Sequence, residues 1–231
     1  MKYCSICLML IILAIAGALS AQEDATPDCP GCDMRLRGWT IGGFFGGGTI
    51  SVDADSPQVS EAMNIDALPE WSYRAGGGIF FYPGGRYRVG IFGGYNWAGV
   101  GDDDKYIETN AIWGTVLPEF VRTTNALHIS GGLGLGGGVA TISGSATGKS
   151  GEGKEQIAMF VMLPRFGIEL PIIDVGVLSV DFSYQWFFGE DRTVEWSDGA
   201  ESVHKLHFSP IEIGGPVISV GLQIGSLRKS R

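Results

Sequence analysis

Apolar and polar side chains alternate with a period of two along residues 175–188. Successive side chains of a strand point to opposite faces, so this segment is predicted to be a strand with one apolar and one polar face. An apolar face this rich in aromatic rings is typical of a strand that lies between lipid and a polar lumen. The apolar positions are Leu178, Val180, Phe182, Tyr184, Trp186 and Phe188, and the polar positions are Ser179, Asp181, Ser183 and Gln185.

Similar alternation recurs along the chain and predicts eight strands. In the first strand the apolar positions change parity between Phe45 and Ile50, and a bulge among the glycines at 42–48 would explain the change. In the fifth strand, glycines at 132, 134, 136 and 138 form an inward row that would leave room for long arginines from across a barrel. The predicted strands are 36–52, 70–82, 85–98, 109–122, 125–142, 156–170, 174–188 and 208–225.

The connections between these strands alternate between short and long. Membrane barrels have short periplasmic turns and long external loops, whereas the loop lengths of a soluble up-and-down barrel need not segregate by end. The pattern therefore predicts an all-β fold, an eight-stranded antiparallel up-and-down transmembrane β-barrel. A soluble exported barrel that binds a lipophilic ligand is the alternative. The short turns are at 83–84, 123–124 and 171–173, and the long loops are at about 53–69, 99–108, 143–155 and 189–207.

Aromatic residues gather at both ends of the predicted lipid face, as in the aromatic girdles of membrane barrels. We expect them to anchor the barrel at the two membrane interfaces. The outer set is Trp71, Tyr73, Tyr95, Trp97, Tyr184 and Trp186, and the periplasmic set is Trp39, Phe81, Tyr87 and Phe120.

Seven charged side chains are predicted to face the lumen. An eight-stranded barrel is just wide enough for its side chains to fill, and buried charges are costly unless they are paired. We therefore expect a structural plug of salt bridges in preference to an ion-conducting gate. These residues are Arg74, Arg86, Arg88, Glu119, Arg165, Glu169 and Asp181.

The N-terminus has the pattern of a secretory signal peptide over residues 1–21. Lys2 supplies the positive charge, residues 8–15 the apolar core, and Ala21 the expected cleavage site. A single-pass anchor is the weaker alternative because the apolar run is short. Residues 22–35 are expected to form a flexible periplasmic segment, 36–226 the barrel and 227–231 a basic tail. Cys29 and Cys32 are expected to form a local disulfide or to remain a loose thiol pair.

The composition of the chain limits the classes of molecule that it is expected to bind. The formal net charge of −9 argues against nucleic acid. We expect a monomer without a cofactor whose partners are outer-membrane lipid and lipopolysaccharide. The long loops are acidic, at Asp102–Asp104 for example. We expect them to be solvated and to supply any surface contacts, with shared divalent cations as the alternative.

Over about residues 36–225, the chain resembles the small eight-stranded outer-membrane barrels of Gram-negative bacteria, the family of the OmpA transmembrane domain and OmpX. The resemblance is one of architecture, and it implies an outer-membrane location. Such barrels commonly end on an aromatic residue, whereas this sequence ends on Arg231. No peptidoglycan-binding domain follows the barrel, so a wall-anchoring role is not expected. The protein is expected to be a non-enzymatic structural or surface-interaction barrel.

One motif supports an enzymatic alternative. Some outer-membrane barrels that trim lipid A carry a His-x-Ser pair, and His128 and Ser130 match that spacing. The flanking Asn and Gly pattern of those enzymes is missing, so polar lining of the lumen is the favoured interpretation. His204 and His207, beside Asp198 and Glu201, could form a metal cluster, but an ordinary loop is expected. The nucleotide-like strings at 132–137 and 143–150 lack the strand–turn–helix context that such sites need.

Overall fold

The structure is a computed structural model. It describes residues 35–49, 71–83, 85–101, 105–123, 127–145, 153–173, 176–197 and 203–230, all of which belong to one compact unit, 34–231. The predicted signal peptide, Cys29 and Cys32 lie outside the described residues. Within these ranges, no helix is long and apolar enough to cross a membrane.

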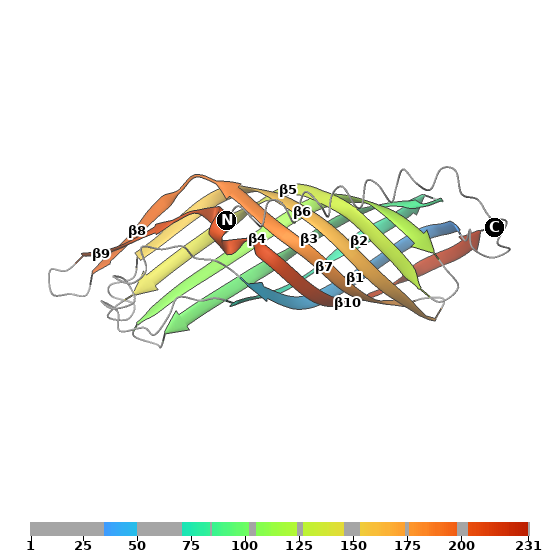
Figure 1. Cartoon of the computed structure of the whole chain (residues 1–231), viewed down its shortest axis with the longest axis horizontal. Helices are drawn as coiled ribbons and strands as arrows, with labels where there is room; N and C mark the ends of the chain where they lie inside the picture. Colours follow the sequence, from blue (N-terminus) through green and yellow to red (C-terminus); the bar gives the residue numbers. More distant parts are fainter. Residues whose placement is uncertain are drawn as a thin grey trace. The chain divides into compact units, whose positions relative to one another are not determined.

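Eight antiparallel strands form a closed barrel, which confirms the predicted fold class (Figure 1). Each barrel strand pairs with its neighbours along the chain, and the last strand closes the barrel against the first. Closure leaves no barrel strand as an open edge. The barrel strands are β1 (Arg35–Thr49), β2 (Trp71–Pro83), β3 (Tyr87–Gly101), β4 (Tyr106–Thr123), β5 (His128–Ser145), β6 (Gly153–Ile173), β7 (Gly176–Gly189) and β10 (Gly215–Ser230).

The fourth long loop contains structure that the sequence pattern did not predict. Strands β8 (Arg192–Ser197) and β9 (Val203–Phe208) form a separate hairpin, and a short 3-10 helix, η1 (Pro210–Ile213), follows it. The predicted last strand, 208–225, is therefore wrong at its start, because Phe208 ends β9 and the barrel strand begins at Gly215. Its end is also later than predicted. Residues 227–230, expected as a tail, pair with β1.

The predicted bulge in the first strand is absent over residues 35–49. β1 keeps an unbroken register with both β2 and β10. Phe44 is buried in the lumen while Phe45 points outward and is 57% exposed. Glycines in β1 allow close approach instead of a bulge: a Cβ on Gly42 would lie 2.2 Å from the carbonyl oxygen of Leu222. Ile50 lies outside the described residues.

The two faces of the barrel wall differ as the alternation predicts. Outward residues are large and apolar, and Ile91 and Ile112 are 70% and 65% exposed. Exposed aliphatic surface around the whole circumference of a barrel is what a lipid-facing wall requires. The inward face is polar toward the short turns and becomes apolar toward the long loops, where Ile107, Ile142 and Ile157 join one buried cluster.

The ten predicted girdle residues have exposed or half-buried side chains on the outward face. At the loop end Trp97 packs beside Tyr73 and Tyr95, with ring centroids 5.8 Å apart in both pairs. Phe45 joins this cluster, 6.1 Å from Trp97. At the turn end the rings of Tyr87 and Phe120 meet edge to face at 5.7 Å.

Candidate functional site

The strand register brings the lumen charges together. Register partners lead once around the barrel from Gly48 to Gly38 when the β2–β3 register is continued by one residue beyond Phe81 and Val89, so that the stagger of the closed sheet is ten residues. Three of the predicted lumen charges, Arg165 of β6, Glu119 of β4 and Arg88 of β3, lie on this line of register partners. The circuit runs through Val217, Ser183, Arg165, Gly132, Glu119, Arg88 and Tyr82.

Five of the predicted residues form one continuous chain of ion pairs, which we call the lumen chain. Its order is Glu169, Arg88, Glu119, Arg165 and Asp181. Arg88 lies 2.5 Å from Glu169 and 2.6 Å from Glu119, and Arg165 lies 2.6 Å from both Glu119 and Asp181. All five side chains are at most 2% exposed. Buried arginine–carboxylate pairs of this kind persist only when their geometry and hydrogen bonding are good.

Neutral groups add hydrogen bonds to the lumen chain. Arg88 donates a further hydrogen bond to the Tyr82 hydroxyl at 2.6 Å. Ser130 donates to Glu169 at 3.2 Å, and Ser179 donates to Asp181 at 3.1 Å. The alternation predicts that Ser130 and Ser179 face the lumen, but it does not indicate which charges they contact.

Aromatic rings cover the faces of the guanidinium groups. The guanidinium carbon of Arg88 lies 4.5 Å from the centre of the Phe80 ring, and that of Arg165 lies 5.3 Å from the Phe92 ring. Such contacts stabilise a cation more strongly where water is excluded. The alternation along the strands does not indicate that either phenylalanine contacts a charged group.

Lumen-facing glycines provide the space that the chain occupies. A Cβ added to Gly167 would lie 2.6 Å from the Ser130 hydroxyl and 2.7 Å from an oxygen of Asp181. A Cβ on Gly132 would lie 2.6 Å from Cγ of Glu119. The glycine row of β5 thus makes room for long side chains, although its neighbour here is a glutamate of the adjacent strand.

Arg74 lies in the lumen outside the lumen chain. Its side chain is 1% exposed and donates to Ser183 at 3.2 Å and to Ser219 at 3.4 Å. It also lies over the rings of Phe44 and Trp113, at 5.0 and 5.6 Å. The lumen chain holds two guanidinium groups and three carboxylates, so Arg74 brings the buried formal charge to zero. Arg74 therefore compensates the net negative charge of the lumen chain over a longer distance than that of an ion pair.

Arg86 is not part of this set, and the prediction that it faces the lumen is wrong. Strand alternation does not extend to it, because β3 begins at Tyr87 and Arg86 lies in the turn before it. Its side chain is exposed. Its carbonyl oxygen accepts a hydrogen bond from the backbone nitrogen of Val121 at 2.6 Å, which ties the turn to β4.

His128 and Ser130 both face the lumen and are buried, as the parity of β5 predicts. The Ser130 hydroxyl donates to Glu169, and Nδ1 of His128 lies 3.8 Å from the other oxygen of the same carboxylate. The imidazole is therefore positioned beside the carboxylate instead of activating the serine as a base. In this arrangement, the His-x-Ser motif supplies polar neighbours to Glu169 of the lumen chain.

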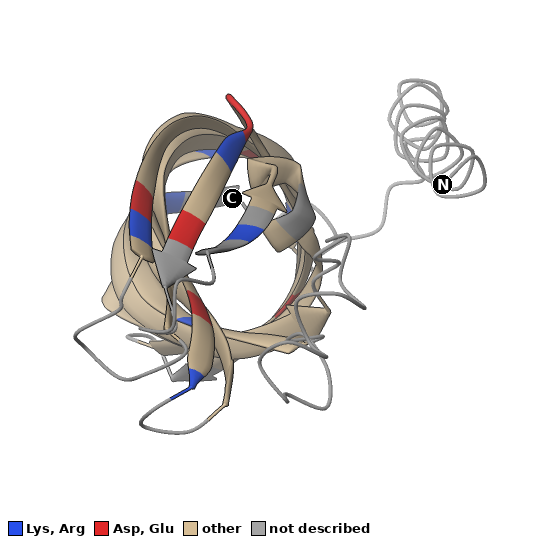
Figure 2. Cartoon of the chain, turned by 90° about the vertical axis from the view of Figure 1, so that its left-hand side faces the viewer, with Lys and Arg blue, Asp and Glu red and all other residues tan. Residues whose placement is uncertain are grey.

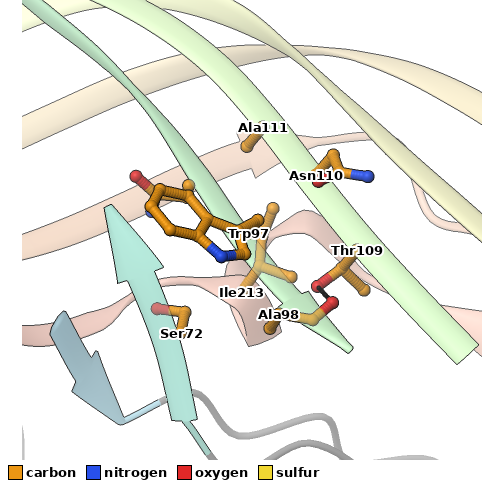
Figure 3. Close-up of a pocket in the computed structure, with 8 residues that line it drawn as sticks. Ser72, Trp97, Ala98, Thr109, Asn110, Ala111 and Ile213 are labelled. Carbon is orange, nitrogen blue, oxygen red and sulfur yellow. Dashed lines mark hydrogen bonds between the residues drawn. The ribbon is translucent and has the colours of Figure 1, made fainter. Parts of the chain in front are cut away.

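Neutral and apolar side chains close the lumen toward the loops. Asn96 donates to Gln185 at 2.6 Å and accepts from the Trp113 indole at 2.9 Å. Closer to the loops, Ile213 of η1 borders a pocket of about 10 Å³, which has room for about one water molecule (Figure 3). The pocket lies near the outer ends of β2, β3 and β4. It is lined by Ser72, Asn96, Trp97, Ala98, Thr109, Asn110, Ala111 and Ile213.

The β8–β9 hairpin packs its apolar side onto the barrel. Val194 and Phe208 are buried in the same cluster as the apolar lumen residues. The exposed side of the hairpin carries charges at the loop end of the barrel (Figure 2). Glu195 pairs with Lys205 at 2.5 Å, and Asp191 lies 3.9 Å from His207. No three potential metal ligands gather among the described residues.

Part of the metal cluster that the sequence analysis considered as an alternative lies outside the described residues. Asp198 and Glu201 lie outside the described residues, and the side chain of His204 is also outside them. His207 is exposed, and its described neighbours are Asp191 and Thr193.

Comparisons with known proteins concern the fold alone. No family model and no curated protein matches the chain. OprG of Pseudomonas aeruginosa, an outer membrane protein, has 12% sequence identity and a TM-score of 0.50, with 84% of this chain and 96% of OprG covered. Neisserial surface protein A has 10% identity and a TM-score of 0.41, with 83% and 96% covered. The Escherichia coli outer membrane protease OmpT has 5% identity and a TM-score of 0.40, with 87% and 99% covered.

The likeness to OprG covers most of this chain and nearly all of OprG at low identity. It agrees with the closed antiparallel barrel, the apolar outer wall and the girdled rims described above. In architecture, the chain is a small eight-stranded β-barrel of the outer-membrane type.

Proposed function

We propose that this protein is a non-enzymatic outer-membrane protein whose plugged barrel is a rigid scaffold for its external loops. The lumen chain carries the proposal. Four ion pairs link strands β3, β4, β6 and β7 across the lumen, with every side chain buried. A solute path through this layer would have to separate buried arginine–carboxylate pairs, which costs several kcal/mol for each pair, about 3–5.

The membrane location is part of the same proposal. The apolar band around the barrel and the aromatic rings at both rims support insertion into a bilayer. The signal-peptide pattern of residues 1–21 supports export, and the short turns then face the periplasm. Outer-membrane lipid and lipopolysaccharide are the proposed partners of the wall. We propose a monomer, because barrel closure leaves no barrel strand with an open edge to share.

Binding would reside in the loops. The β8–β9 hairpin is anchored by Val194 and Phe208, so the charged side chains on its exposed side are held on a fixed platform. Binding residues are disproportionately found on loops that a rigid scaffold positions.

Electrical recording tests whether the lumen chain blocks the passage of ions through the barrel. We expect the full chain, purified from outer membranes and inserted into planar bilayers, to show no stable open channel. A wide porin recorded under the same conditions controls for insertion and sensitivity. Insertion is verified separately by a heat-modifiable band on SDS-PAGE. Long-lived conductance of the wild-type protein would contradict the plug, and recovery of the protein in the soluble periplasmic fraction would contradict the membrane location.

A lipid A-modifying hydrolase is the second candidate. One observation favours it: Glu169 contacts both Ser130 and His128, so a serine, a histidine and a carboxylate lie together. All three side chains are buried in the lumen, away from lipid substrates. Ser130→Ala separates the candidates. An unchanged lipid A mass spectrum rules out the hydrolase, and a loss of a lipid A species in the variant would support it.

A further inference from the structure

Three exposed arginines lie just beyond the aromatic residues at the turn end of the barrel. Arg37 is two residues before Trp39, Arg86 is directly before Tyr87, and Arg122 is two residues after Phe120. We call Arg37, Arg86 and Arg122 the arginine collar. An aromatic girdle marks the membrane interface, so the collar lies at the level of the lipid headgroups on that side.

The collar is built into the ends of the strands. The hydrogen bond from the backbone nitrogen of Val121 to the Arg86 carbonyl places Arg86 beside Arg122 across the β3–β4 wall. The edge-to-face pair of Tyr87 and Phe120 lies in the same part of the wall. Arg37 lies on β1, two strands from β3, and its register partner in β10 is a second arginine, Arg228.

Exposed carboxylates lie at one end of the barrel, whereas exposed basic side chains lie at both. Among the residues for which the structure describes exposure, the exposed carboxylates all lie at the loop end. The three carboxylates nearer the turn end are those of the lumen chain, which are buried and paired with Arg88 and Arg165. The exposed carboxylates are Glu108, Glu190, Asp191 and Glu195.

We propose that the arginine collar binds the phosphate groups of anionic phospholipids in the periplasmic leaflet. This inference rests on the proposed membrane location. Guanidinium groups form bidentate hydrogen bonds with phosphate oxygens. Basic residues beside an anionic membrane surface each add measurable attraction. The collar thus gives the two ends of the barrel different lipid preferences.

The test uses the full chain in lipid nanodiscs that contain phosphatidylcholine and a small fraction of spin-labelled lipid. The measured quantity is the association of spin-labelled phosphatidylglycerol with the barrel, relative to spin-labelled phosphatidylcholine. Both leaflets have the same composition, so the orientation of insertion does not affect the ratio. We expect a ratio above one for the wild-type protein, falling as salt is raised from 0.05 to 0.5 M, conditions chosen to span strong and weak screening, about 14 to 4 Å in Debye length.

Two matched variants locate the effect. Arg37→Gln, Arg86→Gln and Arg122→Gln together remove three positive charges from the collar, and should lower the ratio about five-fold for each arginine in contact with a headgroup, toward one. The control, Lys105→Gln, Lys154→Gln and Arg192→Gln, removes three exposed charges from the loop end and should leave the ratio within about two-fold of wild type.

The possible results separate this inference from the proposed function. A wild-type ratio of one, an unchanged ratio in the collar variant, or an equal loss in the loop-end control overturns the inference while the barrel is inserted. Failure of the wild-type chain to insert, seen as the absence of a heat-modifiable band, overturns the membrane location as well. The salt dependence of the wild-type ratio requires no variant, so the inference stays testable if the collar variant does not fold.

Discussion

Glu119 is the central carboxylate of the lumen chain, and its replacement by glutamine is the most direct test of that chain. It lies 2.6 Å from both Arg88 and Arg165, and its side chain is fully buried. Glutamine has nearly the same volume, so packing is retained while the charge is lost. In Glu119→Gln the buried formal charge, balanced when Arg74 is counted, becomes +1. The side-chain amide nitrogen of the new residue can only donate, and it faces a guanidinium group.

The size of the effect follows from the remaining contacts. Removing one partner of a buried ion pair costs about 3–5 kcal/mol. Arg88 keeps Glu169 and Arg165 keeps Asp181, so we place the loss at the lower limit, about 3 kcal/mol. With a urea dependence of about 1–3 kcal/mol per M, the unfolding midpoint falls by about 1–3 M.

The assay is equilibrium unfolding of the barrel in lipid vesicles, followed by tryptophan fluorescence and by the heat-modifiable band. Glu108→Gln is the matched control, because Glu108 is exposed on the same strand and its loss should change stability by less than about 0.5 kcal/mol. If Glu119→Gln also changes the free energy of unfolding by less than about 1 kcal/mol, the lumen chain does not stabilise the barrel. The double variant with Arg165→Met should lose less than the sum of the two single variants, since the pair interacts directly.

Three further predictions concern other parts of the structure. Gly167→Ala should destabilise the barrel by about 1–3 kcal/mol in the same unfolding assay, because its Cβ would meet Ser130 and Asp181; Gly131→Ala, whose Cβ has its nearest neighbour at 3.8 Å, should be close to neutral. Trp97→Ala should cost about 1–3 kcal/mol through its two stacked tyrosines, and an unchanged unfolding midpoint would argue against a stabilising girdle. Phe208→Ala should loosen the hairpin, seen as faster hydrogen exchange in β8 and β9 with unchanged exchange in β5; equal exchange in variant and wild type would show that burial of this ring does not hold the hairpin.

The sequence predicted the barrel strands well because one physical contrast is repeated along each of them. A residue between lipid and lumen is either apolar or polar by position, so alternation directly indicates both the strand and its faces. The prediction held for residues such as Ile91 and Arg88, which lie on opposite sides of β3. It did not hold for Arg86, because the rule applies only within a strand and this residue lies in a turn.

The contacts within the lumen were not predictable in the same way. Which arginine pairs with which carboxylate depends on the stagger of the closed sheet, and stagger is not visible in any single strand. Three of the predicted lumen arginines, Arg74, Arg88 and Arg165, could pair with Asp181, and only the structure shows that its partner is Arg165. The β8–β9 hairpin was missed because the sequence pattern assigns the long connection at 189–207 to a loop and Phe208, which ends β9, to the start of the last barrel strand.

The lumen chain also constrains how the barrel assembles. Its members come from four strands, and Thr40 and Gln223 add a hydrogen bond of 2.8 Å across the seam where β1 meets β10. In an unclosed sheet these arginines and carboxylates would face either water or acyl chains. Water would hydrate these charges, whereas a partly curled sheet within a bilayer would expose them to lipid at several kcal/mol for each arginine, about 2–4. In the proposed membrane location, insertion and closure of the barrel must therefore occur together.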